Sequence, residues 1–384
     1  MIRNRSLLFL SLVLVLGAVA LPFLTHAPNR LLSGQPVALW AVTPRATLVF
    51  LLPGVVLIAG PFLPQRPRVL LILILAAGVL LAGLVHIAAI GANSLAQVAA
   101  SPSARTSFGA GFWLMTFAAA LALADLTARA GYGPVTRVLI GFLASLPIGA
   151  MVASGHLDQM SIMKEYANKS ELFRTSLIRH FVIVLSALVP TLLIGVPLGV
   201  LAFRKARLGR AVLSSLSIIQ TVPSIALFGL LMAPLSALAV AVPVLMAIGI
   251  SGIGLAPAVI ALTLYSLLPI VRNTAEGLAQ VPVSVVEAAQ GMGMTKRQVF
   301  WQVEVPLALK VFLSGLRVTV VQAIGLAAVA ALIGAGGLGA IMFQGLFSNA
   351  LDLVLLGALP IIAIAVVADA LFKLGVAMAQ KGAA

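Results

Sequence analysis

The stretch from Val283 to Pro306, VSVVEAAQGMGMTKRQVFWQVEVP, is a polar, glycine-containing interruption between two long apolar segments of the chain. Its first half has the spacing of a short amphipathic helix, with Val285, Val286 and Ala289 on one face. Ser284 and Glu287 have the spacing of an N-terminal capping box. The pattern therefore predicts a helix over about 283–290.

The second half of this stretch predicts a turn and a second helix. Gly291 and Gly293 permit a tight turn, because glycine adopts backbone conformations that side chains obstruct. Thr295 can cap a helix that runs from Lys296 to about Val303. Pro306 is expected to end that helix and to begin the next apolar segment.

The segments on either side are typical of membrane helices. The chain of 384 residues is 62% hydrophobic and only 9% charged, whereas roughly a quarter of the residues in a soluble domain are charged. Continuous apolar runs of about 20 residues, enough to cross a bilayer, recur along the whole length. They lack the alternating polarity of barrel strands. We therefore expect an all-α polytopic membrane protein with about ten transmembrane helices.

Five of these spans are expected in the first part of the chain and five in the second. They cover roughly 7–24, 46–63, 69–90, 111–126, 138–152, 181–203, 211–232, 258–271, 311–333 and 353–372. Residues 233–256 are apolar but interrupted by proline and glycine, so they could form an eleventh span, a re-entrant hairpin or a loop. A hairpin or loop is favoured, because an eleventh span would reverse the orientation that follows from the charges.

The net charge of +15 is explained by topology. Lysine and arginine occur in small groups at the ends of the apolar runs, and cytoplasmic loops carry the excess of these residues. Their distribution favours cytoplasmic N- and C-termini and places 283–306 in the cytoplasm. It gives no reason to expect nucleic acid as a partner. The lipid bilayer is the expected environment.

The sequence carries no signature of an enzyme. It contains no P-loop, no H-E-x-x-H and no G-x-S-x-G. The G-x-G-x-x-G match at 334–339 follows a membrane span, not a strand, so dinucleotide binding is not expected. The four histidines are isolated in the sequence, and Arg317 and Asp369 are expected to snorkel toward span ends. We expect no catalytic residue, no metal site and no cofactor.

The interruption at 283–306 resembles the EAA loop of permease subunits in bacterial ATP-driven importers. Glu287, Ala288, Ala289, Gly293 and Pro306 stand at the family's positions. The resemblance implies a cytoplasmic helix-turn-helix that docks on a separate ATPase, which binds the ATP and Mg²⁺. It also implies a type I ABC importer permease core in the C-terminal half.

A closer resemblance covers a little over half of the chain, from about Glu171 onward. The segments that carry it are IQTVPS at 219–224, LYSLLPIVRNT at 264–274, GMGMT at 291–295 and IGAGGLG at 333–339. They are similar to permeases of glycine betaine, carnitine and choline importers within the methionine-importer-like group. An osmoprotectant solute is therefore implied, with a methionine-like amino acid or an ion-coupled carrier as alternatives.

The resemblance also implies partners and an arrangement of domains. The partners would be ATPase subunits, a second permease chain, identical or different, and a periplasmic solute-binding protein at a bacterial inner membrane. Residues 1–153 would form an N-terminal extension of about five spans, 154–180 a periplasmic amphipathic linker, and 181–384 the permease core. Polar residues expected near the translocation path are Gln220, Thr221, Ser224, Tyr265 and Asn273. No aromatic cluster suited to a quaternary amine is evident in the second domain.

Overall fold

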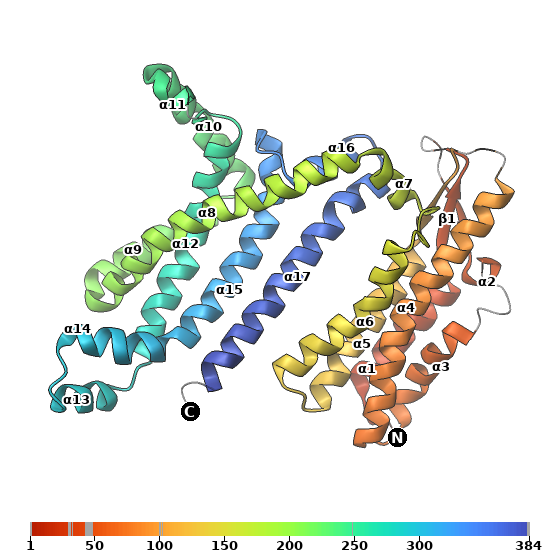
Figure 1. The fold of residues 1–384 in the computed structure, drawn as a ribbon, viewed down its shortest axis with the longest axis horizontal. Helices are drawn as coiled ribbons and strands as arrows, with labels where there is room; N and C mark the ends of the chain where they lie inside the picture. The colour runs from red at the N-terminus through yellow and green to blue at the C-terminus, as the bar shows by residue number, and fades with distance from the viewer. Residues whose placement is uncertain are drawn as a thin grey trace. The chain divides into compact units, whose positions relative to one another are not determined.

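The computed structural model of the protein describes residues 2–29, 32, 34–42, 49–99, 101, 103–247 and 249–381. The chain divides into two compact units, Met1–Asn168 and Lys169–Ala384, called the N-terminal and the C-terminal unit below (Figure 1). Eight of the described helices are long and apolar enough to cross a membrane, and three further apolar helices are shorter. The expectation of a polytopic α-helical membrane protein is therefore confirmed.

The N-terminal unit is a helical bundle with a small sheet at one end. Its helices are α1 (Arg5–Val19), α2 (Leu39–Val42), α3 (Leu52–Ala59), the 3-10 turn η2 (Gly60–Phe62), α4 (Pro67–Val98), α5 (Ala110–Arg129), α6 (Pro134–Ala153) and α7 (Ser161–Asn168). Leu73 and Leu84 of α4 are fully buried, and Ala118 and Ala122 of α5 belong to the same hydrophobic core. Pro67 and Pro134 each stand in the first turn of their helix, where the missing N–H is tolerated.

The small sheet was not predicted from the sequence. Strands β1 (Leu24–Ala27), β2 (Gln35–Val37) and β3 (Arg105–Phe108) are antiparallel in the order β2-β1-β3. Each strand has only three or four residues. That length is too short for an alternating pattern to stand out between apolar helices.

Two histidines that are far apart in the sequence meet in this unit. Nε2 of His156 lies 3.1 Å from Nδ1 of His86, and the two rings stack with centroids 5.0 Å apart. The expectation that all four histidines are isolated is therefore wrong for these two. The described residues contain no group of three or more side chains that could hold a metal ion.

The C-terminal unit consists of helices only, within its described residues. They are α8 (Ser170–Arg204), α9 (Ala206–Thr221), α10 (Ser224–Ala241), α11 (Pro243–Ala247), α12 (Leu255–Ala279), α13 (Val283–Gly291), α14 (Lys296–Val299), the π-helical turn η3 (Phe300–Glu304), α15 (Val305–Val329), the 3-10 turn η4 (Ala330–Ile333), α16 (Leu338–Phe347) and α17 (Leu351–Lys381). The helix α12 is the most buried of the long apolar helices described in this unit, between α8 and α15.

Glycines allow these helices to approach closely. A Cβ atom at Gly199 of α8 would lie 2.5 Å from Cβ of Thr274 on α12, and one at Gly315 of α15 would lie 2.3 Å from Cβ of Asn273. Both distances are far inside van der Waals contact. The α12 backbone is therefore held close to two neighbours at positions where only glycine fits.

Two expected elements differ in the structure. The expected span 211–232 is broken at Val222 and Pro223, because Pro223 interrupts the helix between α9 and α10. The expected linker 154–180 is not one element, since α7 ends at Asn168 in the N-terminal unit and α8 begins at Ser170 and continues to Arg204.

The open question about residues 233–256 is also answered. Pro234 lies inside α10, which continues to Ala241, and α11 has only five residues. Crossing a bilayer takes about 20 residues. In its described residues, 233–247 and 249–256, the segment therefore contains the end of α10, a short helix and the start of α12, and no separate eleventh span.

Candidate coupling loop and translocation path

The turn between α13 and α14 is closed by a Schellman motif centred on Gly293. The Gly293 N–H donates to the carbonyl of Gln290 at 2.9 Å, and the Met294 N–H donates to that of Ala289 at 3.2 Å. Gly293 has a φ of +87°, in the left-handed region, and the space around a Cβ atom there is open. Glycine is therefore needed for its backbone conformation and not for lack of room.

The predicted cap of the second helix is confirmed. Thr295 and Gln298 form a capping box, with the Thr295 N–H donating to Oε1 of Gln298 at 2.8 Å. The predicted capping box of Ser284 and Glu287 is wrong. The N-cap of α13 is Pro282 and has no side-chain hydrogen bond, so Ser284 already lies inside the helix.

The hairpin presents an exposed surface. Glu287, Ala288 and Gly293 are exposed, whereas Ala289 is buried beneath them. Two large apolar side chains beside them, Met292 at 77% and Trp301 at 60%, are also exposed. In Figure 1 this hairpin lies at one end of the C-terminal unit, beyond the ends of α12 and α15. The arrangement suits docking onto another protein.

The hairpin connects to the long helices without a break. Residues Lys296–Ile333 form one continuous helical path that passes through the π-helical turn η3. Pro306 therefore does not end the second helix, as the sequence analysis expected. It stands at the start of α15 directly after η3, so the π-helical turn precedes the point where a proline removes a helical hydrogen bond.

An ion pair joins this turn to α8. Nη2 of Arg204 donates to Oε2 of Glu304 at 2.6 Å, and the Glu304 side chain is only 8% exposed. The Arg204 guanidinium also lies over the ring of Phe300, 5.6 Å from its centroid. The sequence analysis missed this pair, although a glutamate directly before the apolar run of α15 was a signal.

Two of the expected path residues meet at the break between α9 and α10. Nε2 of Gln220 donates to the backbone carbonyl of Tyr265 at 2.9 Å. The Tyr265 hydroxyl donates back to the carbonyl of Val222. These two hydrogen bonds attach the break at Pro223 to α12. The carbonyl of Val222 lies where no helical hydrogen bond reaches it, so the tyrosine satisfies a backbone group that the break exposes.

The other three expected path residues are placed differently. Thr221 donates its hydroxyl to the carbonyl of Ile218, and Ser224 is the first residue of α10, so both belong to the break. Asn273 lies two turns further along α12, where its amide donates to the carbonyl of Pro269. It is thus not beside the other four. That any of the five lines a path stays a prediction.

Arg317 and Asp369 do not snorkel separately. Nε of Arg317 donates to Oδ1 of Asp369 at 2.5 Å, and Nζ of Lys373 lies 2.7 Å from Oδ2 of the same aspartate. The three residues link α15 to α17. An ionised aspartate that is partnered by two cations serves as a bridge between helices.

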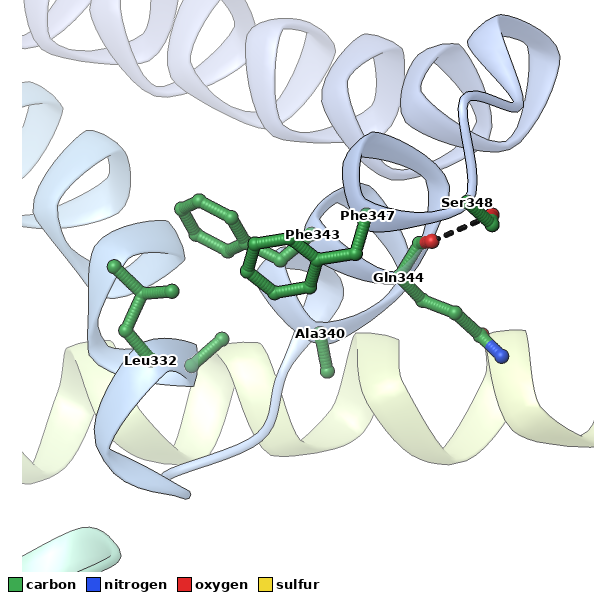
Figure 2. Close-up of a pocket in the computed structure, with 7 residues that line it drawn as sticks. Leu332, Ala340, Phe343, Gln344, Phe347 and Ser348 are labelled. Atoms are coloured by element: carbon green, nitrogen blue, oxygen red, sulfur yellow. Dashed lines mark hydrogen bonds between the residues drawn. The ribbon is translucent and has the colours of Figure 1, made fainter.

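An open cavity of about 640 Å³ lies beside α16 (Figure 2). The rings of Phe343 and Phe347 stack with centroids 6.1 Å apart. They extend to the same side of α16, toward Leu332 of η4. The remaining lining residues are Ala331, Ala340, Gln344 and Ser348. The second domain therefore does contain an aromatic pair, contrary to the expectation from the sequence, because the four-residue spacing brings the rings together on one helix face.

The fold and the hairpin define a class of protein, the membrane-embedded permease subunit of a transport system. Residues 166–376 match the family described as binding-protein-dependent transport system inner membrane component, and the chain belongs to this family. Residues 3–163 match the family described as the N-terminal domain of the ABC transporter permease YehY. Members of the first family transport solutes and are not themselves enzymes.

Several curated relatives share the C-terminal half. The chain is 44% identical over 209 residues to the osmoprotectant import permease protein OsmW of Salmonella typhimurium, which covers 53% of this chain and 90% of the relative. It is 39% identical over 194 residues to the glycine betaine/carnitine/choline transport system permease protein OpuCD of Bacillus subtilis. This match covers 50% of this chain and 77% of the relative. For the choline transport system permease protein OpuBD of Bacillus subtilis the identity is 36%, and the match covers 55% of this chain and 86% of the relative.

Among solved structures, the chain is similar to inward-facing conformations of the MetNI methionine ABC transporter. The identity is 24%, the match covers 54% of this chain and 97% of the other, and the TM-score is 0.45.

Proposed function

We propose that this chain is the permease subunit of an ATP-driven importer for osmoprotectants such as glycine betaine or choline. The names of the relatives support this solute class over the methionine alternative. ATP and Mg²⁺ would be bound by a separate ATPase, because the chain contains no P-loop. The further partners would be a second permease chain and a periplasmic binding protein.

The observation that carries the proposal is the exposed hairpin of α13 and α14 and its two attachments. The surface that an ATPase would bind consists of Glu287, Ala288 and Gly293. The continuous helix through η3 connects this surface to α15, and Glu304 connects it to Arg204 on α8. A displacement of the hairpin would thus act on two membrane helices at once, which is what alternating access requires.

The membrane orientation and the domain roles belong to the same proposal. The hairpin would face the cytoplasm of a bacterial cell, with both termini on that side of the inner membrane. Residues 181–384 would form the transport core and residues 1–153 a membrane extension of about five spans. The five residues Gln220, Thr221, Ser224, Tyr265 and Asn273 would lie near the path.

A matched pair of glycine variants tests the docking surface. Gly293→Val places a β-branched residue at a φ of +87°, a conformation that such residues avoid, whereas Gly291→Val adds the same side chain two residues earlier, within α13. We expect the wild type and Gly291→Val to co-purify with the ATPase of the same system in detergent. The Gly293→Val variant should no longer co-purify with the ATPase.

Uptake in proteoliposomes then identifies the solute and the energy source. With the ATPase and binding protein present, the wild type should take up labelled glycine betaine or choline only when ATP is inside with the ATPase. If no ATPase associates and a proton or sodium gradient alone drives uptake, the chain is an ion-coupled carrier. If labelled methionine is taken up instead, the amino-acid alternative is correct.

A further inference from the structure

The open cavity beside α16 has no part in the proposed coupling of the hairpin to α8 and α15. Its lining contains two phenylalanines, three aliphatic residues, one amide and one hydroxyl, and no charged residue. Its volume lies within the range of about 300–1,000 Å³ that is typical of small-molecule sites. Phe347 is 77% exposed, so at least one ring face is available to a ligand.

We propose that Phe343 and Phe347 form a transit site for the quaternary ammonium group of the solute, where the cation rests against the two rings before it enters the path. The inference deepens the proposed function and rests on it for the identity of the solute. The face of a phenyl ring attracts a cation through its quadrupole. A trimethylammonium group donates no hydrogen bond, so it needs no acceptor in place of its water, and the ring faces supply electrostatic stabilisation of its charge.

The composition of the lining argues for this class of cation over others. A metal ion or a primary ammonium would need carboxylates or several acceptors to replace its water. None of the lining residues carries a carboxylate. One cation lies beside the lining, because Nζ of Lys169 is 3.4 Å from Oε1 of Gln344. The Gln344 side chain, to which this lysine donates, extends away from the two rings (Figure 2).

The position of the site fits the entry side of the path. The hairpin of α13 and α14 lies at one end of the C-terminal unit, and α16 lies at the opposite end (Figure 1). They are separated by the 25 residues of α15, a length of about 38 Å at the helical rise per residue. If the hairpin faces the cytoplasm, as proposed above, the cavity faces the side where a binding protein releases its solute.

Weak binding is expected and suits transit. Each exposed cation–π contact corresponds to roughly a two- to fivefold change in affinity. Two such contacts without a carboxylate hold a cation only briefly. A site that passes a solute onward must bind strongly enough to be entered and weakly enough to be left.

Saturation-transfer NMR with the full-length chain in detergent tests the site, with choline as the probe. Its neutral carbon isostere, in which a tert-butyl group replaces the trimethylammonium, is the matched ligand. Phe343→Leu with Phe347→Leu keeps the lining apolar but removes both rings, and should bind choline roughly 5- to 30-fold more weakly. Phe347→Tyr should retain binding. Phe117→Leu, on an exposed phenylalanine of α5, is the control and should have no effect.

The outcomes separate this inference from the proposed function. Choline binding that exceeds binding of the isostere and depends on the two rings supports the site. Equal binding of the isostere, or no loss in the double variant, overturns it even if the wild type imports choline with ATP. If ATP-dependent uptake is absent but ring-dependent choline binding persists, the proposed function fails while the aromatic site stands.

Discussion

Arg204 at the end of α8 donates to the carboxylate of Glu304 in η3 at 2.6 Å, across 100 residues of sequence. The glutamate is almost fully buried, whereas the arginine is half exposed. The pair therefore connects the π-helical turn that follows the α13–α14 hairpin to a second membrane helix. π-Helical turns often occur at functional sites, where they interrupt the regular helical ladder. Under the proposed function, a displaced hairpin would therefore act on α8 and α15 together.

Glu304→Gln is expected to uncouple the transporter and not to prevent docking. The amide keeps the shape of the side chain but loses the charge-assisted hydrogen bond, at a cost of about 1.5–3 kcal/mol in the free energy of unfolding. Thermal unfolding in detergent should show the lower Tm. The ATPase should still co-purify, because the docking surface is unchanged, while uptake per ATP hydrolysed should fall.

Glu171→Gln is the matched control for Glu304→Gln. Its partner Arg174 lies 2.9 Å away, but both side chains are more than 70% exposed. An exposed ion pair contributes little to stability, so neither the Tm nor the coupling should change. Equal effects of the two variants would mean that the buried pair has no special role.

The hairpin shows what the sequence could and could not predict. Gly293 and Thr295 were identified correctly, because a left-handed turn and an N-cap depend on a few neighbouring residues. The proposed box at Ser284 was wrong because the N-cap is Pro282, two residues earlier, a typical uncertainty at helix ends.

Contacts between distant segments could not be predicted from neighbouring residues, as the turn and the N-cap could. The sequence does not say that Arg204 and Glu304, or Arg317 and Asp369, lie on neighbouring helices. Hydrophobic periodicity identifies membrane helices but not their neighbours, since lipid-facing and helix-facing residues are alike in polarity. Pro223 lies inside the expected span 211–232, and a proline there can either bend or break a helix.

Thr295→Ala is expected to loosen α14, whereas Ser284→Ala should leave α13 unchanged. The threonine is the N-cap of α14, and loss of such a cap costs about 0.5–2 kcal/mol. The serine is not a cap. Hydrogen exchange of the amides at 296–299 should become faster in the first variant only. Faster exchange in α13 of the second variant would contradict the helix start at Val283.

Tyr265→Phe is expected to weaken the attachment of the Pro223 break to α12. The variant leaves the carbonyl of Val222 without its partner, at a cost of about 1–3 kcal/mol. The Tm should fall and uptake should slow. Tyr132→Phe in the N-terminal unit is the control, because no hydrogen bond of its hydroxyl is recorded among the described residues. If both variants behave like the wild type, the hydroxyl does not hold the break.

Gly315→Ala is expected to separate α12 from α15, and Gly325→Ala on the same helix is its matched control. A Cβ at Gly315 would lie 2.3 Å from Cβ of Asn273, so one helix must move, whereas a Cβ at Gly325 has open space around it. Overpacking of this kind costs about 1–3 kcal/mol. In contrast, alanine in place of an unconstrained helical glycine gains up to about 1 kcal/mol. The Tm should therefore shift in opposite directions in the two variants. A lower Tm in both would show that α15 needs glycine for flexibility and that the close approach to Asn273 does not decide its stability.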